Sequence, residues 1–171
     1  KTKLVPKIGQ SAKILYSIYL LLTAAEILCL RIAGMPWYDS IVHAMSTVAT
    51  GGFSSRTASL GAYESLAVNV IVVVFMLLSS LNFAMLYFVL VKHTMRLRDN
   101  REIQIYFAIL AGAVALITAD LMLHSNLGGL ESLGHAVFQT VSVSSTTAFV
   151  TADFGQWPAF SQMLLLVLMA I

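Results

Sequence analysis

The stretch TVATGGFSSR, from Thr47 to Arg56, lies between two long apolar runs of the chain. It is only mildly hydrophobic, and it holds the adjacent glycines Gly51 and Gly52 among several hydroxyl side chains. A second stretch, TVSVSSTTAFVTADF from Thr140 to Phe154, has the same character. The two stretches look like versions of one structural device, so the fold depends on what such a device does in an apolar chain.

The composition of the chain is that of a membrane protein. Its 171 residues are 58% hydrophobic and 11% charged, whereas a soluble domain is roughly half apolar and a quarter charged. Leu66–Val91 and Ile103–Ala119 contain no charged residue, and about 20 apolar residues are enough to cross the hydrocarbon core of a bilayer. These runs argue against a soluble helical protein and predict an all-α membrane protein. The net charge of +2 gives no indication of nucleic-acid binding, and the single Cys29 excludes an intrachain disulfide.

One order of segments occurs twice: an apolar span, a short helical segment, a polar turn and another span. Gly34 and Pro36 end the first span, because glycine is a common helix cap and proline cannot continue a helix. HAMSTV (His43–Val48) and HAVFQTV (His135–Val141) mark equivalent places, and GGFSS matches TAFVT. Such an internal duplication predicts a repeat architecture. The predicted spans lie at about 8–33, 64–93, 103–123 and from 158 onward, and the short helices are YDSIVHAMSTVAT and ESLGHAVFQTVSVS.

Basic residues gather at the start of the chain and between its two units. Cytoplasmic loops of membrane proteins carry an excess of lysine and arginine, so we expect both regions to be cytoplasmic. Two spans separate the regions, which is consistent with this orientation, and the polar turns then enter from the outer side. The basic residues are Lys1, Lys3, Lys7 and Lys13, followed by Lys92, Arg96, Arg98 and Arg101.

A polar turn at membrane depth needs a reason, because non-helical backbone is tolerated there only when it is buried in protein or lines a water-filled cavity. Its free carbonyl groups can replace the hydration shell of a cation. Glycine accepts the backbone angles that such a turn requires, and a short helix whose C-terminal end points at the turn adds negative potential. From composition alone, the two polar turns could equally be ordinary external loops. Two equivalent turns directed at one axis favour a pore lining.

At these residues the chain resembles the Trk/Ktr/HKT superfamily of potassium and sodium uptake proteins. STVATGGFSSR and FQTVSVSSTTAFVTADFGQWP are similar to its second and third pore loops. VPKIGQSAKILYSIYLLLT is similar to the first span of the second repeat in the bacterial TrkH/KtrB branch. The resemblance covers essentially the whole chain and implies a potassium-channel-like pore of four repeats, each a span, a pore helix, a filter loop and a span. The chain would hold one pore repeat at 1–98 and a second at 99–171, truncated in its last span, so we expect a fragment of a longer protein.

The resemblance also implies a function, which is potassium uptake by a multi-pass protein of the cell (plasma or inner) membrane. K⁺, or else Na⁺, would be the transported ion, and no cofactor is expected in this chain. The implied partners are the lipid bilayer, a second copy in a homodimer and a cytosolic nucleotide-binding regulatory subunit of the TrkA/KtrA type, with no nucleic acid. A sodium-permeable or non-selective transporter and a non-conducting structural subunit remain alternatives. We expect no enzyme, because no His or Lys is placed to activate Ser79 or Ser80.

The resemblance assigns ion coordination to the two turns. Matched at the phenylalanine that both turns share, the family's filter glycine falls on Gly52 in the first turn and on Ala148 in the second. A left-handed backbone is costly for alanine, so Ala148 must either bear that strain or turn its carbonyl group differently. The expected ion-binding residues of the selectivity filter are Ala49, Thr50, Gly51, Gly52, Thr146, Thr147 and Ala148.

Other polar residues near the turns leave alternatives open. Asp153 could concentrate cations in an outer vestibule, or it could bond backbone amides in a turn. Arg56 follows the first turn and would oppose cations there. His43 and His135 suggest a two-metal site, yet no further His or Cys lies at a suitable spacing. We therefore expect these histidines to serve helix packing or to bond a neighbouring carbonyl group, with no transition-metal site.

Overall fold

The structure is a computed structural model that describes residues 8–63, 65–81, 101–125 and 128–170, and of residues 8–11 and 102 only the backbone. The described residues form helices and no strand, as the sequence predicts. The helices are α1 (Ile8–Ile32), α2 (Trp37–Val48), α3 (Leu66–Ser80), α5 (Arg101–His124), α6 (Gly129–Ser144) and α7 (Ala159–Leu168), with the short 3-10 helices η1 (Ser59–Tyr63) and η3 (Phe154–Gln156).

Two of these helices are long and apolar enough to cross a membrane, α1 over Ala12–Ile32 and α5 over Ile103–His124. Both agree with the spans that hydropathy predicts. Only 28% and 22% of their most apolar windows are buried within the described chain. The remaining apolar side chains of these helices are therefore free to contact lipid or further protein.

The link between α1 and α2 is set by Gly34 and Pro36. Gly34 takes φ +96° and donates its N–H to the Arg31 carbonyl, while Met35 donates its N–H to the Leu30 carbonyl at 3.1 Å. This pair of bonds closes a helix C-terminus around a left-handed glycine. Pro36 then caps α2, so the chain reverses within a few residues and lays α2 along α1.

Helix α3 is shorter than its apolar pattern predicts. The Ser65 hydroxyl caps its first turn by accepting the N–H of Val68. The helix ends at Ser80, because Leu81 takes extended backbone angles (φ −76°, ψ 147°), whereas the apolar pattern runs on to Val91. The rest of that predicted span lies in 82–100, outside the described residues, as do the basic residues at 92, 96 and 98 and the boundary predicted at 98.

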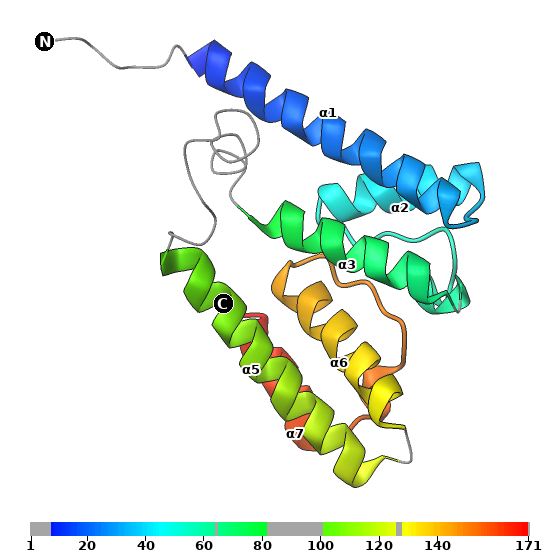
Figure 1. Ribbon diagram of the computed structural model, residues 1–171, viewed down its shortest axis with the longest axis vertical. Helices are drawn as coiled ribbons and strands as arrows, with labels where there is room; N and C mark the ends of the chain where they lie inside the picture. The colour runs from blue at the N-terminus through cyan, green and yellow to red at the C-terminus, as the bar shows by residue number, and fades with distance from the viewer. Residues whose placement is uncertain (1–7, 64, 82–100, 126–127, 171) are drawn as a thin grey trace, which may run out of the picture.

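Helices α2 and α6 each lie against the two other helices of their own unit. Helix α2 packs on α1 and α3, while α6 packs on α5 and α7 (Figure 1). Contact between α3 and α6 joins the two groups, and Figure 1 shows these helices side by side at the centre of the molecule. One core spans the contact. It includes Leu30, Ala44, Leu60, Val72, Met76, Phe138 and Phe149, all of them nearly inaccessible to solvent.

Candidate functional site

The first polar turn follows directly from the C-terminal end of α2. Ala49 keeps helical backbone angles (φ −81°, ψ −1°) and caps the helix. Thr50 then takes φ +51° and Gly52 takes φ +68°, so the chain passes twice through the left-handed region. The N–H of Thr50 donates to the Thr47 carbonyl at 3.0 Å. The negative end of the α2 dipole is therefore directed at this turn.

The second polar turn repeats this backbone path at the end of α6. Ser145 caps the helix with φ −79° and ψ 0°. Thr146 takes φ +59° and Ala148 takes φ +60°. The N–H of Thr146 donates to the Val143 carbonyl at 3.0 Å. Ala148 thus adopts the left-handed conformation itself, which is the first of the two possibilities that the sequence leaves open for it.

The matched angles and bonds fix how the two units correspond. Thr50 corresponds to Thr146, and Gly52 corresponds to Ala148. This register agrees with the sequence match of GGFSS with TAFVT. Two separate segments with the same alternation of left-handed residues indicate one backbone geometry used twice, because a non-glycine residue at positive φ is uncommon.

The same register corrects the predicted equivalence of the two histidines. Counted back from the matched turns along α2 and α6, His43 corresponds to Gln139, and His135 corresponds to Asp39. HAMSTV and HAVFQTV are therefore one helical turn out of step. The prediction was wrong because a shared His-Ala pair carries no information about register, whereas the bonds that end each helix do.

The two turns touch each other at Gly52. A Cβ atom added to Gly52 would lie 2.1 Å from the Thr147 carbonyl oxygen, which is far inside any real contact distance. Two features therefore require glycine at position 52: the backbone angle of φ +68° and the close approach of the second turn. The side chain of Thr147 is fully buried, while Thr146 and Ala148 remain exposed on the described surface. The backbones of the two candidate turns are thus in direct contact at this point.

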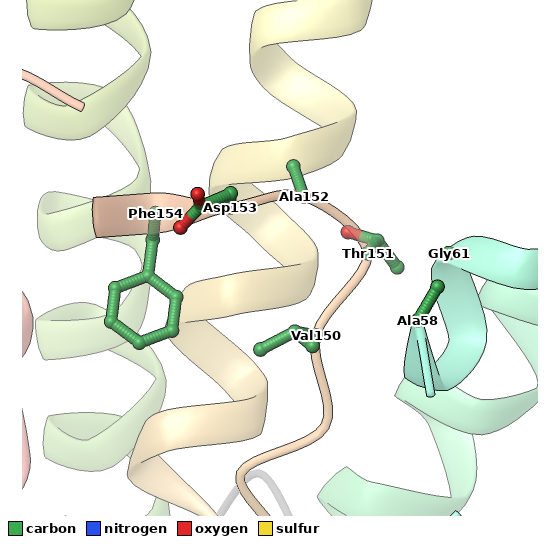
Figure 2. A pocket seen from close by; sticks show the side chains of 7 residues that line it. All are labelled: Ala58, Gly61, Val150, Thr151, Ala152, Asp153 and Phe154. Atoms are coloured by element: carbon green, nitrogen blue, oxygen red, sulfur yellow. The ribbon is translucent and has the colours of Figure 1, made fainter. Parts of the chain in front are cut away.

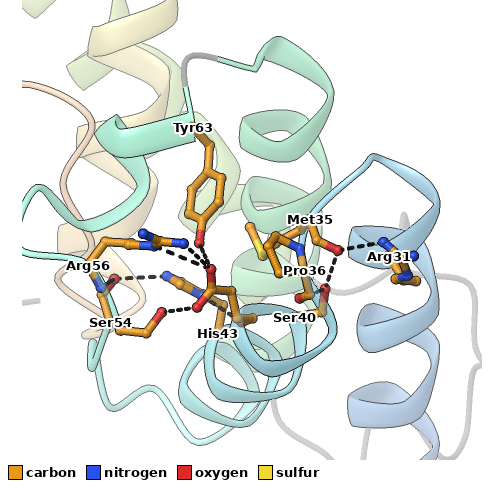
Figure 3. Close-up of polar contacts among 10 residues, drawn as sticks. Arg31, Met35, Pro36, Ser40, His43, Ser54, Arg56 and Tyr63 are labelled. Atoms are coloured by element: carbon orange, nitrogen blue, oxygen red, sulfur yellow. Dashed lines mark hydrogen bonds and ion pairs between the residues drawn. The ribbon is translucent and has the colours of Figure 1, made fainter.

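A buried carboxylate ties the segment after the first turn to the start of α2. Asp39 is 4% exposed, and it accepts hydrogen bonds from the Ser55 hydroxyl at 2.5 Å and the Tyr63 hydroxyl at 2.6 Å. The Arg56 guanidinium donates to the same carboxylate at 3.0 Å (Figure 3). Asp39 was not among the sequence-predicted site residues. An acid in the first turn of a short helix, with an arginine just past the following turn, is the signal that could have found it.

These partners settle the charge of Asp39 and Arg56. The Ser55 hydrogen bond, then the Tyr63 hydrogen bond and then Arg56 lower the pKa of Asp39 from 3.8 to about 2, against the opposing effect of burial. Asp39 is therefore ionised at neutral pH and compensates the charge of Arg56. This pairing reduces the repulsion of cations that was expected from Arg56 at the outer end of the first turn.

His43 bonds a neighbouring carbonyl group, as predicted, whereas His135 approaches a hydroxyl group. His43 is fully buried, and its Nδ1 donates to the Asp39 carbonyl at 2.7 Å, which leaves Nε2 to accept from the Ser54 hydroxyl at 2.9 Å. Burial lowers the pKa of His43, in agreement with this neutral tautomer. His135 Nδ1 lies 3.4 Å from the Thr151 hydroxyl. Among the described residues, no group of three or more His, Cys, Asp or Glu side chains is placed to hold a metal ion.

Asp153 lies beside a hollow where the two units meet. Its carboxylate accepts the N–H of Gly155 at 3.0 Å and the Gln156 side-chain amide at 3.0 Å, so it caps η3. The hollow has a volume of about 490 Å³ and is also lined by Ala58, Gly61 and Thr151 (Figure 2). The turn-bonding role that the sequence allows for Asp153 is thus present, and the residue also faces an open space.

The arrangement is chemically suited to coordination of a cation by backbone oxygens. Each turn presents consecutive peptide groups and small hydroxyl side chains at the C-terminal end of a short helix. Carbonyl groups held in this way can replace the water around a dehydrated cation. The helix dipole adds negative potential at the same place. The backbones of the two turns contact each other where Gly52 meets Thr147.

Comparisons with known proteins agree with this geometry. The model of the TrkH family, described as cation transport protein, matches residues 1–119. The TrkH potassium uptake protein of the Trk system from Halomonas elongata is 38% identical over 97% of this chain and 35% of its own length. The corresponding protein of Salmonella typhimurium is 37% identical over 96% of this chain and 34% of its own.

A solved structure is also similar. The crystal structure of the potassium transporter TrkH from Vibrio parahaemolyticus superimposes with a TM-score of 0.88 at 35% identity, over 98% of this chain and 37% of that one. The fold predicted from the sequence, an all-helical membrane protein, is confirmed by this match. The chain spans about a third of the length of the relatives that it matches.

Proposed function

The chain belongs to the TrkH family of cation transport proteins, and we propose that it forms two pore repeats of a potassium uptake protein. One repeat covers residues 1–98 and the other covers 99–171. The order of helices supports this division, since α1, α2 and α3 recur as α5, α6 and α7 around an equivalent turn. The names of the relatives, which are potassium uptake proteins of the Trk system, support K⁺ as the transported ion.

The single observation that carries the proposal is the repeated pair of left-handed residues. Thr50 and Gly52 in one turn, and Thr146 and Ala148 in the other, share the same backbone path after a short helix. Each path places non-helical peptide groups at the negative end of a helix dipole, where their oxygens can coordinate a cation. The filter then comprises Ala49, Thr50, Gly51 and Gly52 of the first repeat and Thr146, Thr147 and Ala148 of the second.

We further infer that Asp153 contributes negative potential at the outer mouth. Its carboxylate is exposed and lies at the rim of the hollow between the repeats. A carboxylate there raises the local concentration of cations. Asp39 and Arg56 form a compensated pair close by, so they add little net charge to the same region.

The surroundings of the chain follow from its exposed apolar surface. On α1, Leu28 and Ile32 are 56% and 86% exposed, and on α5 Leu123 is 79% exposed. Side chains of this kind need lipid or further protein as neighbours. They support a multi-pass protein of the cell membrane, in which further repeats complete the pore. The proposed partners are a second copy in a homodimer and a cytosolic nucleotide-binding regulatory subunit, which the membership of the relatives in the Trk system supports.

Ion flux from liposomes tests the proposal. The full-length protein is reconstituted, and the efflux of K⁺ and of Na⁺ is followed separately under matched gradients. Faster K⁺ efflux than Na⁺ efflux, without consumption of any substrate, is the expected result. Equal rates would support the sodium-permeable alternative instead, and no flux of either ion would support a non-conducting membrane subunit.

A further inference from the structure

One serine of α6 holds the second turn from two sides. Ser142 is fully buried, and its carbonyl oxygen accepts the N–H of Ala148 at 3.0 Å. Its hydroxyl donates to the carbonyl oxygen of Phe149 at 2.6 Å. The two bonds lie on either side of the left-handed Ala148 backbone, and Phe149 itself is fully buried. The conformation of Ala148 is therefore fixed from both ends by a single residue.

The first turn lacks this arrangement. Ser46 corresponds to Ser142 in the register of the two turns, and its carbonyl accepts the N–H of Gly51 at 2.7 Å. The buried hydroxyl of Ser46, however, has no hydrogen-bond partner among the described residues. The residue that follows in this turn is Gly52, which takes φ +68° without steric cost. The side-chain bond thus occurs in the turn where alanine stands in place of glycine.

We propose that Ser142 is a positioning residue of the second pore turn, whose hydroxyl keeps Ala148 in the conformation that Gly52 adopts unaided. The inference rests on the proposed function, because it concerns the selectivity of the same turns. The Ser142 hydroxyl holds the Phe149 carbonyl group toward α6. With this bond in place, Ala148 keeps the left-handed backbone angle that Gly52 has in the first turn.

The consequence is a specific coupling between two positions. Without the Ser142 hydroxyl, Ala148 can relax out of the left-handed region, because that region is unfavourable for a residue with a Cβ atom. Relaxation turns its carbonyl group away from the ion path. With glycine at position 148 the left-handed region is no longer unfavourable, so loss of the hydroxyl should matter much less. Residues that share a contact are expected to be non-additive in this way.

A double-mutant cycle tests the coupling in the full-length protein reconstituted in liposomes. The cycle compares the unchanged protein, Ser142→Ala, Ala148→Gly and the double variant, with the K⁺/Na⁺ permeability ratio as the readout. Ser142→Ala should lower the ratio about tenfold, the equivalent of about 1.4 kcal/mol. In the Ala148→Gly background the same change should stay within about twofold. Ser46→Ala is the matched control, because it removes the equivalent hydroxyl of the first turn, which has no hydrogen-bond partner among the described residues. It should leave the K⁺/Na⁺ permeability ratio unchanged.

A conservative variant and a second readout separate positioning from simple stabilisation. Ser142→Thr retains the hydroxyl and should keep a ratio near that of the unchanged protein. The proposal is overturned if Ser142→Ala lowers thermal stability but leaves the K⁺/Na⁺ permeability ratio unchanged. It is also overturned if Ser142→Ala lowers that ratio equally in the protein with Ala148 and in the Ala148→Gly variant. If Gly52→Ala changes the ratio and Ser142→Ala does not, the positioning role fails while the pore assignment stands. If neither changes it, both fail.

Discussion

Gly52→Ala is the substitution that the geometry of the pore turns opposes most strongly. The added Cβ atom would lie 2.1 Å from the Thr147 carbonyl oxygen and 3.3 Å from its carbonyl carbon. Both atoms belong to the backbone of the other turn, so no side chain can rotate away. Either the first turn unwinds or the second turn moves, and in both cases the two sets of peptide oxygens lose their common alignment.

The size of the effect has two parts. A left-handed backbone costs a residue other than glycine about 1–2 kcal/mol. Forcing an extra methyl group into a closely packed site typically costs about 1–3 kcal/mol more. We therefore expect Gly52→Ala to lower stability by roughly 2–5 kcal/mol in total. If only 1.4 kcal/mol of this appears as lost discrimination between K⁺ and Na⁺, the permeability ratio falls about tenfold.

The assay needs a control that separates the two parts, and Gly34 supplies it. Gly34 also has positive φ, at +96°, but an added Cβ atom there meets nothing within 4 Å. Gly34→Ala should therefore show only the conformational cost, about 1–2 kcal/mol, with an unchanged K⁺/Na⁺ ratio. Thermal denaturation of the purified full-length protein and K⁺ and Na⁺ flux from liposomes are measured for both variants.

Two results would refute the reasoning. The first is a Gly52→Ala protein with the flux ratio of the unchanged protein, because the turn would then not face the ion path. The second is an equal loss of ratio in Gly34→Ala, because the effect would then reflect general destabilisation of the membrane helices rather than the contact between Gly52 and Thr147.

Four further predictions follow from other contacts. Asp39→Asn removes the charge that Ser55, Tyr63 and Arg56 bond, and it should destabilise by roughly 2–3 kcal/mol in a denaturation assay, whereas the exposed Asp153→Asn should change stability by less than about 1 kcal/mol. Because the pKa of Asp39 is lowered from 3.8 to about 2, its contribution is complete above pH 4 and is lost as pH falls toward 2. The acid-induced loss of stability across that window should therefore be smaller in Asp39→Asn, and an identical pH profile would contradict the pairing. Glu26 is fully buried in α1, and a buried unpaired charge is costly. Glu26→Gln should therefore change the free energy of unfolding by less than about 1 kcal/mol, whereas Glu26→Lys should prevent folding. Equal effects of the two substitutions would contradict this prediction. A cysteine that replaces Asn100, in a Cys29-free background, should react with a membrane-impermeant reagent only from the cytoplasmic side. Labelling of this cysteine from outside intact cells would contradict the predicted orientation.

The sequence predicts the helices well because hydropathy and helix-ending residues act locally. The first spans of both units and both short helices are recovered, since an apolar run long enough to cross a bilayer leaves few alternatives. Gly34 and Pro36 mark the reversal between α1 and α2 for the same local reason. The end of α3 at Ser80 is not visible in the pattern, because Leu81 is as apolar as the residues before it.

The location of the two turns was predictable from the sequence, but the bonds around them were not. The residues of both turns follow from the match at Phe53 and Phe149, and the left-handed angles at Gly52 and Ala148 agree with that match. The bonds around them depend on groups brought together by the fold. Asp39 meets Arg56 only because η1 and the segment after the turn fold back over α2, and no local pattern encodes that return.

The register of the two repeats shows a further limit of sequence patterns. Two histidines in similar short segments suggest equivalence, yet the cap bonds of α2 and α6 pair His135 with Asp39 instead. Both residues at that position contact the segment after the turn, Asp39 through Ser55 and His135 toward Thr151. Residues of different chemistry therefore make the equivalent contact in the two units, which similarity of side chains cannot reveal.

The most direct test of the pore assignment is the location of a heavy monovalent cation. The full-length protein is crystallised with Rb⁺ or Tl⁺ in place of K⁺, and the anomalous difference density is examined around both turns. The account predicts density within coordination distance of carbonyl oxygens from residues 50–52 and 146–148, on the face where the turns meet. Ordered turns without any such density, or density only at sites remote from them, would contradict it.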